Sequence, residues 1–240
     1  MRIISLVPSI TKTLFDLGLG NHDLVGRTKF CIHPENLVKN IPIIGGTKNL
    51  NIDKIKELKP DLILANKEEN TKEQVEELQQ YFRVWVSDIK NLKDNENFLW
   101  ELGMLLKKNK EAEEINKEIE TIYSHFKGNQ PKKVAYLIWQ NPYMTIGGDT
   151  FINEILEKIG CENIFKNRTR YPEINLEDIK DAQYLFLSTE PFPFNEKHVL
   201  ELQKLLPNVK ILLVDGEAFS WFGSHIAEYK KYYQNLVDSI

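Results

Sequence analysis

The sequence predicts an α/β protein with two lobes of mainly parallel sheets flanked by helices, joined by one long rigid α-helix. Apolar strand-like runs alternate with helix-like segments over residues 1–91, and the same alternation returns over residues 128–240. This alternation favours parallel sheets covered on both faces. Between the two stretches, residues 92–127 contain no proline and a single glycine. We therefore expect a first lobe at 1–91, a linking helix at 92–127 and a second lobe at 128–240.

The first lobe begins with an apolar strand at 3–7, followed by a helix with Ser9 or Thr11 as its N-cap. Later in this lobe, Asn51 is expected to cap a short helix that Pro60 ends. The remaining expected elements are strands at 24–26, 61–65 and 83–86 and a helix at 71–80.

The linking helix is predicted from apolar side chains that recur three, four or seven residues apart, as on one stripe of an amphipathic helix. Asp94 or Asn95 could cap its start, and Gly128 with Pro131 would stop it. At about 1.5 Å per residue, roughly thirty residues would span about 45 Å. A coiled coil is the weaker interpretation, because the repeat is not sustained over enough heptads.

The second lobe repeats the pattern of the first. The segment at 175–181, NLEDIKD, resembles the segment at 51–57, NIDKIKE, and each precedes an apolar strand. This match predicts an internal duplication, with ligand loops from both lobes at the carboxyl ends of the strands. The expected elements are strands at 133–139, 184–187 and 210–214 and helices at 150–159, 195–206 and from about 223 onward.

Composition and charge exclude several classes of protein. The chain has 42% hydrophobic and 28% charged residues, which is ordinary for a globular protein, and its net charge of −4 gives no basic footprint for nucleic acid. No apolar run approaches the roughly 18 residues of a membrane helix. No secretory signal is visible, so the expected location is cytoplasmic, or periplasmic or cell-surface if an export signal has been removed. Cys31 and Cys161 fall in different lobes and are expected to stay unpaired.

The familiar catalytic motifs are missing. The chain has no phosphate-binding glycine loop and no G-x-S-x-G turn. Asp149 could act as an acid or base, although its place beside Thr150 is more simply that of a helix-start residue. The histidines form no H-x-x-x-H pair, and Cys31 with His33 would need further ligands to hold a metal.

Aromatic residues in loops are the more informative signal. Core packing would explain about half of them, and the others would suit a cleft for a large, flat, partly apolar ligand. Acidic residues in both lobes are typical of solvated surface, or could dock on basic surfaces of a partner. The aromatic residues are Phe30, Tyr143, Tyr171, Phe192, Phe194, Phe219, Trp221 and Phe222, and the acidic ones are Glu68, Glu69, Glu73, Glu190 and Glu196.

Three segments spread along the chain resemble one family. They are IISLVPS at 3–9, LKPDLILA at 58–65 and GCENIF at 160–165. Together with the two expected lobes and long helix, they resemble the helical-backbone (cluster A-III type) substrate-binding proteins of ABC importers. The likeness is greatest to the cobalamin and iron–siderophore branch of that periplasmic binding protein-like group.

This resemblance implies a set of functional residues. By position, the ligand contacts would be Phe30, Tyr143, Met144, Tyr171, Glu217 and Trp221. Lys48 and His225 would orient polar edges of the ligand or, for His225, approach its metal. Acidic docking points, one per lobe, would be Glu73 (or Glu68 or Glu69) and Glu190, which would meet arginines of the importer's membrane subunits. The sequence departs from the family at Thr47-Lys48, where a tryptophan is expected, and lacks a basic residue expected near Trp221.

The expected function is reversible binding of a corrinoid or related metal chelate between the lobes, without catalysis. We expect no intrinsic cofactor, a monomer, possible ABC-importer membrane subunits as partners, no nucleic acid and no membrane-spanning segment. Three alternatives stay open: a cytoplasmic corrinoid or metal-chelate sensor or carrier, a protein that binds metal ions directly through residues such as His33 and His225, and an enzyme with Asp149 or Glu217 as base.

Overall fold

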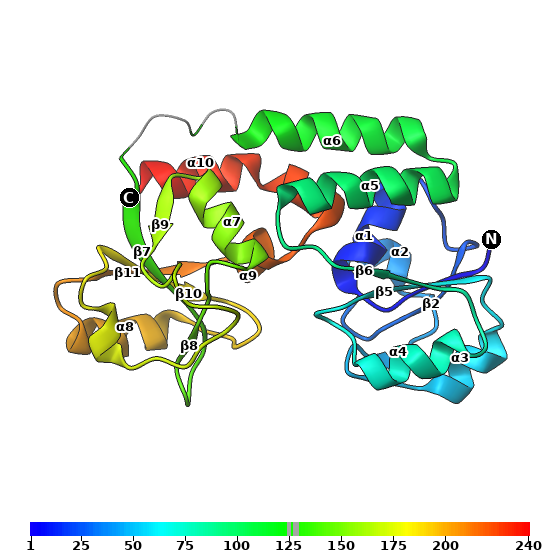
Figure 1. Ribbon diagram of the computed structural model, residues 1–240, viewed down its shortest axis with the longest axis horizontal. Coiled ribbons are helices and arrows are strands. Elements are labelled where there is room, and N and C mark those ends of the chain that lie inside the picture. The colour runs from blue at the N-terminus through cyan, green and yellow to red at the C-terminus, as the bar shows by residue number, and fades with distance from the viewer. Residues whose placement is uncertain (124–125, 127–129) are drawn as a thin grey trace. The chain divides into compact units, whose positions relative to one another are not determined.

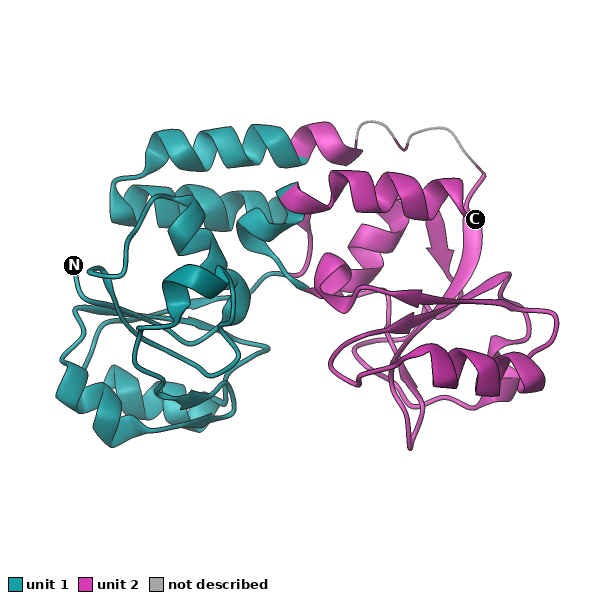
Figure 2. Cartoon of the chain, turned by 180° about the vertical axis from the view of Figure 1, so that it is seen from behind, with its two compact units in different colours: residues 1–89, 93–119, 221–227 teal, residues 90–92, 120–220, 228–240 magenta. Residues whose placement is uncertain are grey.

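The computed structural model describes residues 1–123, 126 and 130–240, and the chain forms two compact units (Figure 2). The first unit contains residues 1–89, 93–119 and 221–227, and the second contains 90–92, 120–220 and 228–240. Most of the segment expected as a linker therefore belongs to the first unit. A short segment from near the C-terminus, 221–227, also belongs to it.

The first unit is built on a parallel sheet in the order β2-β1-β5-β6, as the alternating pattern predicts. All four strands point the same way, so the loops that follow them leave from one edge of the sheet. A two-residue hairpin, β3 with β4, lies outside this sheet. The strands are β1 (Ile3–Ser5), β2 (Leu24–Arg27), β3 (Gly45–Gly46), β4 (Asn49–Leu50), β5 (Leu62–Asn66) and β6 (Val84–Ser87).

Helices cover both faces of this sheet. In Figure 1, α3 and α4 lie on one side of it, and α1 and α5 lie on the other. Asn51 caps α3 as expected, because its side chain accepts a hydrogen bond from the backbone N–H of Lys54 at 3.0 Å. The helices are α1 (Pro8–Asp16), α2 (Glu35–Val38), α3 (Ile52–Leu58), α4 (Lys72–Gln79) and α5 (Leu92–Leu106).

The expected start of α1 is wrong. The helix begins at Pro8, with Val7 at the N-cap position and no side-chain cap. Proline fits the first turn of a helix because its missing N–H would have no intrahelical acceptor there. The hydroxyl of Thr11 instead donates to the Ser5 hydroxyl at 2.8 Å.

The single long linking helix is also wrong, because two helices occupy this segment. The chain turns back after α5 and continues as α6 (Asn109–Tyr123), and the two helices lie side by side (Figure 1). Lys107 makes the turn with a left-handed φ of +59°. A Cβ on Gly103 would lie 2.7 Å from the Cβ of Ala112, so the missing side chain permits this close packing. The predicted helix end at 127 and the stop signal Gly128 lie outside the described residues.

Asn95, expected as a cap, lies inside α5 and has a different role. Its side-chain oxygen accepts a hydrogen bond from the backbone N–H of Gly223. This bond ties the segment 221–227 to the first unit.

The second unit repeats the topology of the first. Its parallel strands β9, β7, β10 and β11 follow the same order in space as β2, β1, β5 and β6, which supports the internal duplication. Strand β8 adds an antiparallel partner to β7. The strands are β7 (Lys132–Trp139), β8 (Met144–Thr145), β9 (Cys161–Asn163), β10 (Tyr184–Ser188) and β11 (Lys210–Val214).

Helices also cover both faces of the second sheet. α8 lies on one side of it, and α7 and α10 lie on the other (Figure 1). Asn175 opens a single turn of 3-10 helix, with a capping box formed with Asp178. The last expected helix is divided into a 3-10 segment and α10. These elements are α7 (Phe151–Lys158), η2 (Leu176–Ile179), α8 (Glu196–Leu205), α9 (Gly216–Ser220), η3 (Gly223–Tyr229) and α10 (Lys230–Asp238).

Both cysteines are buried and unpaired. Within the described part of the chain, no helix has the length and apolar character that crossing a membrane requires.

Candidate functional site

In the first unit, the loop after β2 presents an exposed aromatic ring. Phe30 is 49% exposed, and the ammonium of Lys29 lies 4.9 Å from the centre of its ring. The backbone N–H of Lys29 donates to the carbonyl of Gly45 at 2.8 Å. A Cβ on Gly46 would lie 3.3 Å from the Phe30 ring, so the ring rests against a glycine hairpin. This arrangement leaves an apolar surface beside a positive charge.

Lys48, at the tip of the same hairpin, reaches the loop after β5. Its ammonium donates to the backbone carbonyl of Glu68. The side-chain amide of Asn70 donates to the carbonyl of Thr47 at 3.0 Å, which fixes the hairpin to that loop. The hairpin therefore lies at the carboxyl edge of the sheet, where a parallel α/β sheet places its ligand loops.

Trp221 and His225 form an aromatic cluster with His33. The ring centres of Trp221 and His225 are 4.7 Å apart, and that of His33 lies 5.7 Å from Trp221 and 6.2 Å from His225. Trp221 is 9% and His225 is 4% exposed, whereas His33 is half-buried. The structure thus joins two expected ligand residues to His33, which the sequence suggested only as a metal ligand.

The segment that carries this cluster is anchored in the first unit. The hydroxyl of Ser224 donates to the carboxylate of Asp16 at 2.5 Å, and its backbone N–H donates to the hydroxyl of Thr13 at 3.1 Å. Gly223 has a φ of +83°, and a Cβ there would lie 2.1 Å from the Thr13 hydroxyl. Only glycine permits this backbone conformation at residue 223, and the conformation fixes the segment that carries Trp221.

Direct metal binding gains no support from this cluster. Among the described residues, no group of three or more His, Cys, Asp or Glu side chains is arranged to hold a metal ion. A zinc-type site needs at least three protein ligands, and His33 with His225 would supply two.

In the second unit, three expected ligand residues come together on two paired segments. Tyr143 and Met144 lie on one segment, and Tyr171 lies on the segment that runs antiparallel to it. Their side chains are half-buried. The pairing bonds are Ile174 N–H to Tyr143 O at 3.0 Å, Thr145 N–H to Pro172 O at 3.0 Å and Gly147 N–H to Arg170 O at 2.7 Å.

Arg170 also belongs to this group, although the sequence analysis did not select it. Its guanidinium carbon lies 5.5 Å from the centre of the Tyr171 ring. Its backbone N–H donates to the carboxylate of Asp149 at 2.6 Å. Asp149, considered above as a helix-start residue or a base, thus holds the backbone of the neighbouring loop. Only the dipeptide Arg-Tyr before a proline was visible in the sequence, and it does not reveal this contact.

Two acidic residues of the second unit lie beyond β10 and β11: Glu190 in the loop after β10, and Glu217 in the first turn of α9, which follows β11. Glu190 is half-buried, and its carboxylate accepts a hydrogen bond from the Ser220 hydroxyl at 2.7 Å. A Cβ on Gly216 would lie 2.3 Å from the Cγ of Glu190, so glycine makes room for this side chain. Glu217, also half-buried, donates its backbone N–H to Asp215 at 3.0 Å. Glu190 therefore lies among the carboxyl-edge loops, whereas Glu73 is exposed in the first turn of α4.

The other loop aromatics divide as expected between core and surface. Phe194, Phe219 and Phe222 are buried. Phe192 is half-buried and packs against Trp139 with ring centres 5.6 Å apart, and Trp139 is 39% exposed. A second aromatic surface is therefore formed by Trp139, the last residue of β7, and Phe192, in the loop after β10.

Comparisons of the sequence and the fold identify proteins that are similar to this chain. A family model described as "Periplasmic binding protein" matches residues 3–200. A vitamin B12-binding protein of Vibrio vulnificus is 28% identical over 195 residues, which cover 78% of this chain and 71% of that protein.

Two solved structures are similar over nearly their whole length. One is the periplasmic vitamin B12 binding protein of Vibrio cholerae, at 20% identity, a TM-score of 0.84, and coverage of 99% of this chain and 96% of that one. At that identity the likeness shows the fold alone. The other is a possible iron-binding (periplasmic solute-binding) protein of Staphylococcus epidermidis, at 25% identity, a TM-score of 0.82, and coverage of 99% and 97%.

Proposed function

The chain belongs to the periplasmic binding protein family, and we propose that it binds a corrinoid or related metal chelate reversibly, as the substrate-binding component of an ABC importer. The observation that carries this proposal is the exposure of aromatic rings at the carboxyl edges of the parallel sheets. Phe30 in the first unit and Trp139 in the second are the most exposed of them. Rings of this kind give contact area to a large flat ligand, and the polar groups beside them orient it.

The relatives support a chelate as the ligand. The vitamin B12-binding relative is 28% identical to this chain over 195 residues. The dipeptide Thr47-Lys48 lies where a tryptophan is expected from the family resemblance, so we expect the polar contacts in the first unit to differ from those of a standard cobalamin binder.

The protein acts as a binding protein and catalyses no reaction. The family and its named relatives are binding proteins. Asp149, one candidate base, already accepts a hydrogen bond from the backbone of Arg170. We expect a monomer without an intrinsic cofactor, and Glu73 remains the predicted docking point for an importer's membrane subunits.

The family is described as periplasmic, and so is the 25% identical protein of Staphylococcus epidermidis, which supports the exported location among the two expected from the sequence. The cytoplasmic location, and with it the cytoplasmic sensor or carrier, receives no support from these relatives.

Titration of the purified protein with cobalamin and cobinamide tests this function. Tryptophan fluorescence would follow binding, and calorimetry would confirm its stoichiometry. We expect saturable binding that Phe30→Ala weakens about tenfold, because an exposed ring loses contact area with the ligand. Tyr81→Ala is the matched control, since Tyr81 is 56% exposed and precedes β6 at the amino edge of the sheet. No binding of either corrinoid at about 100 μM, where a complex of about −5 to −6 kcal/mol begins to form, would overturn the corrinoid assignment.

A further inference from the structure

The aromatic surface of the second unit rests on a cluster of rings that includes one histidine. Trp139, at the end of β7, is 39% exposed, and the centre of its ring lies 5.6 Å from that of Phe192. The ring of Phe192 also packs against Phe194, at 4.7 Å. The centre of the His198 imidazole lies 5.4 Å from that of Phe192 and 5.4 Å from that of Phe194. Phe192 is therefore in contact with both the exposed ring and the imidazole.

His198 also caps α8. It is the third residue of this helix, and its Nδ1 accepts a hydrogen bond from the backbone N–H of Asn195 at 3.1 Å. The side chain of Asn195 accepts in return from the backbone N–H of Lys197 at 3.1 Å. This arrangement is a capping box, in which the third helical residue is usually Glu or Gln. Here a titratable ring takes that position.

The capping bond requires a neutral imidazole. A backbone N–H can only donate, so Nδ1 of His198 carries the lone pair and the ring hydrogen lies on Nε2. A protonated imidazole bears a hydrogen on both nitrogens and cannot accept the bond. Its positive charge would also lie in the first turn of a helix, where unpaired backbone N–H groups already carry partial positive charge. Protonation of His198 therefore removes the cap.

The surroundings of the imidazole offer no carboxylate to compensate its charge. Among the residues that the structure describes, none forms an ion pair with His198. The loop before α8 presents only the two phenylalanine rings to it. Glu190, the one titratable residue of that loop, accepts a hydrogen bond from Ser220 instead. On α8 itself, the ionisable residues next to His198 in the sequence are Glu196, Lys197 and Glu201.

The cap is connected to the aromatic surface through the loop between β10 and α8. Asn195 directly follows Phe194, whose backbone N–H donates to the carbonyl of Phe192 at 2.8 Å. The N–H of Phe192 donates to the carbonyl of Ile138, the residue before Trp139, at 3.3 Å. Loss of the cap would thus release one end of the loop that holds Phe192 against Trp139.

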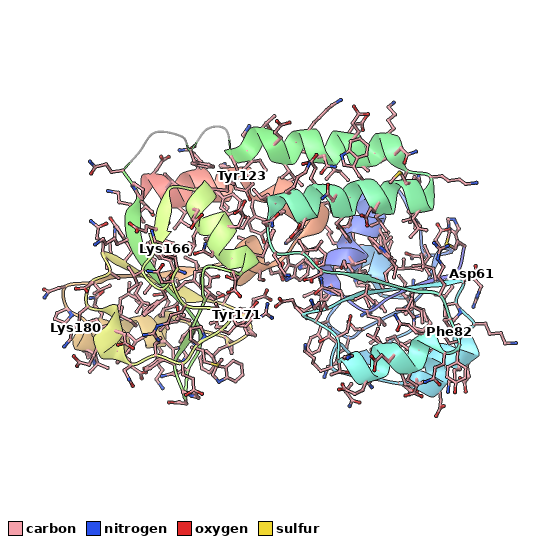
Figure 3. The ribbon with its side chains drawn as sticks, viewed as in Figure 1. Asp61, Phe82, Tyr123, Lys166, Tyr171 and Lys180 are labelled. Atoms are coloured by element: carbon pink, nitrogen blue, oxygen red, sulfur yellow. The ribbon has the colours of Figure 1, made fainter. Side chains whose placement is uncertain are left out.

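This surface adjoins the expected ligand residues of the second unit. The side-chain nitrogen of Gln140, next to Trp139, lies 3.5 Å from the hydroxyl of Tyr143. Tyr143 belongs to the segment that pairs with the one carrying Tyr171, which Figure 3 labels. Tyr143 and Phe192 also pack against the same hydrophobic core. A displacement of Phe192 would therefore alter the surface to which these residues contribute.

We propose that His198 is a positioning residue that makes ligand binding depend on pH. While the imidazole is neutral, the cap holds Phe192 against Trp139 and the ligand surface is formed. Protonation removes the cap and lowers the affinity, because only the fraction of the protein with the formed surface binds. Imidazoles change charge between about pH 5 and pH 8, so mild acid releases the ligand. This inference rests on the proposed function and adds a condition under which the ligand leaves.

Cobalamin titrations at about pH 7.5 and 5.5, on both sides of the usual imidazole titration, test the inference with His198→Gln. Glutamine is a regular third residue of a capping box and stays neutral, so it keeps an acceptor at both pH values. On acidification, the affinity of the unaltered protein should fall about fivefold more than that of His198→Gln, as expected for the loss of one helix cap. His33 and His225 are present in both proteins, so their titration does not affect this comparison.

Two further variants separate the cap from a general loss of structure. His198→Ala has no acceptor and should bind about fivefold more weakly than His198→Gln at both pH values. His22→Gln carries the same substitution at an exposed histidine before β2 in the first unit, and it should keep the pH dependence of the unaltered protein.

The protonation state of the ring is measured without a ligand. Nitrogen NMR of the imidazoles at about pH 7.5 should show His198 with its hydrogen on Nε2, and His198→Gln assigns the signal. A hydrogen on Nδ1, or an equal fall of affinity in the unaltered protein and His198→Gln, would overturn the inference and leave the proposed function standing. Failure of cobalamin and cobinamide to bind at the higher pH would overturn the proposed function and the inference with it.

Discussion

The carboxylate of Asp149 accepts a hydrogen bond from the backbone N–H of Arg170 at 2.6 Å. Asp149 directly precedes Thr150, whose hydroxyl caps α7 by accepting from the N–H of Asn153 at 3.3 Å. The bond therefore connects the start of α7 to the loop that presents Arg170 and Tyr171. A residue considered as a catalytic base instead holds the backbone of this loop.

Replacing Asp149 should act on the ligand through the loop that carries Tyr171. We expect Asp149→Ala to weaken the binding of the corrinoid about fivefold, because the loss of a charge-assisted hydrogen bond releases the backbone of Arg170 beside Tyr171. Asp149→Asn keeps an acceptor oxygen and should have a smaller effect. The dissociation constants of the two variants, measured by calorimetry, check this. Unchanged affinity in Asp149→Ala would show that this bond does not position a ligand loop.

Substitutions of the two acidic residues predicted as docking points should have different effects on the ligand affinity. Glu190 lies among the carboxyl-edge loops and bonds to Ser220, so Glu190→Ala should change the ligand affinity several-fold. Glu73 is exposed on α4, so Glu73→Ala should leave it unchanged. The dissociation constants of the two variants, measured by fluorescence, check this. If Glu190→Ala left the affinity unaltered, Glu190 would return to the docking role that the family resemblance implies.

The turn between α5 and α6 depends on close packing at Gly103. We expect Gly103→Val to lower the free energy of unfolding by about 1–3 kcal/mol, because its side chain would collide with Ala112. The control is Met104→Val, which introduces the same β-branched residue at the next position, where the side chain is 62% exposed. It should lower the free energy of unfolding by less than about 0.5 kcal/mol. Urea denaturation of the two variants compares them. Similar stabilities would show that the two helices do not need glycine at this position.

The buried thiols should make stability fall at high pH. Burial raises the pKa of Cys161 to about 12 and also raises the pKa of Cys31. Because the folded state holds these protons more tightly than the unfolded chain, the contribution of each thiol is complete below its unfolded pKa of about 8.5. It is lost as the pH rises above that value, by up to about 1.4 kcal/mol per pH unit for each thiol.

Urea denaturation between pH 7 and pH 10 measures this loss. Cys161→Ala should show a shallower decline than the unaltered protein. In the native state at pH 8, neither thiol should react with a thiol reagent until the protein unfolds. Rapid reaction without denaturant would contradict the burial of these side chains.

Local patterns account for what could be predicted without a structure. Strand and helix alternation requires only the side chains of each element, and Asn51 caps α3 through a residue three positions away. The repeated segments at 51–57 and 175–181 indicated a duplication, which the matching strand orders support. The aromatic residues Phe30 and Tyr171 were selected because they lie between elements.

Contacts between residues far apart in the sequence determine the features of the structure that the sequence did not predict. The turn at Lys107 has no glycine or proline within it, and the packing of the two helices that it joins requires the close approach of Gly103 to Ala112. Trp221 belongs to the first unit because Gly223 bonds to Asn95, a residue 128 positions earlier. Arg170 is oriented by Asp149, 21 positions away. Periodicity reports which face of an element is apolar, but the partner of a backbone N–H across such separations depends on how the chain folds back on itself.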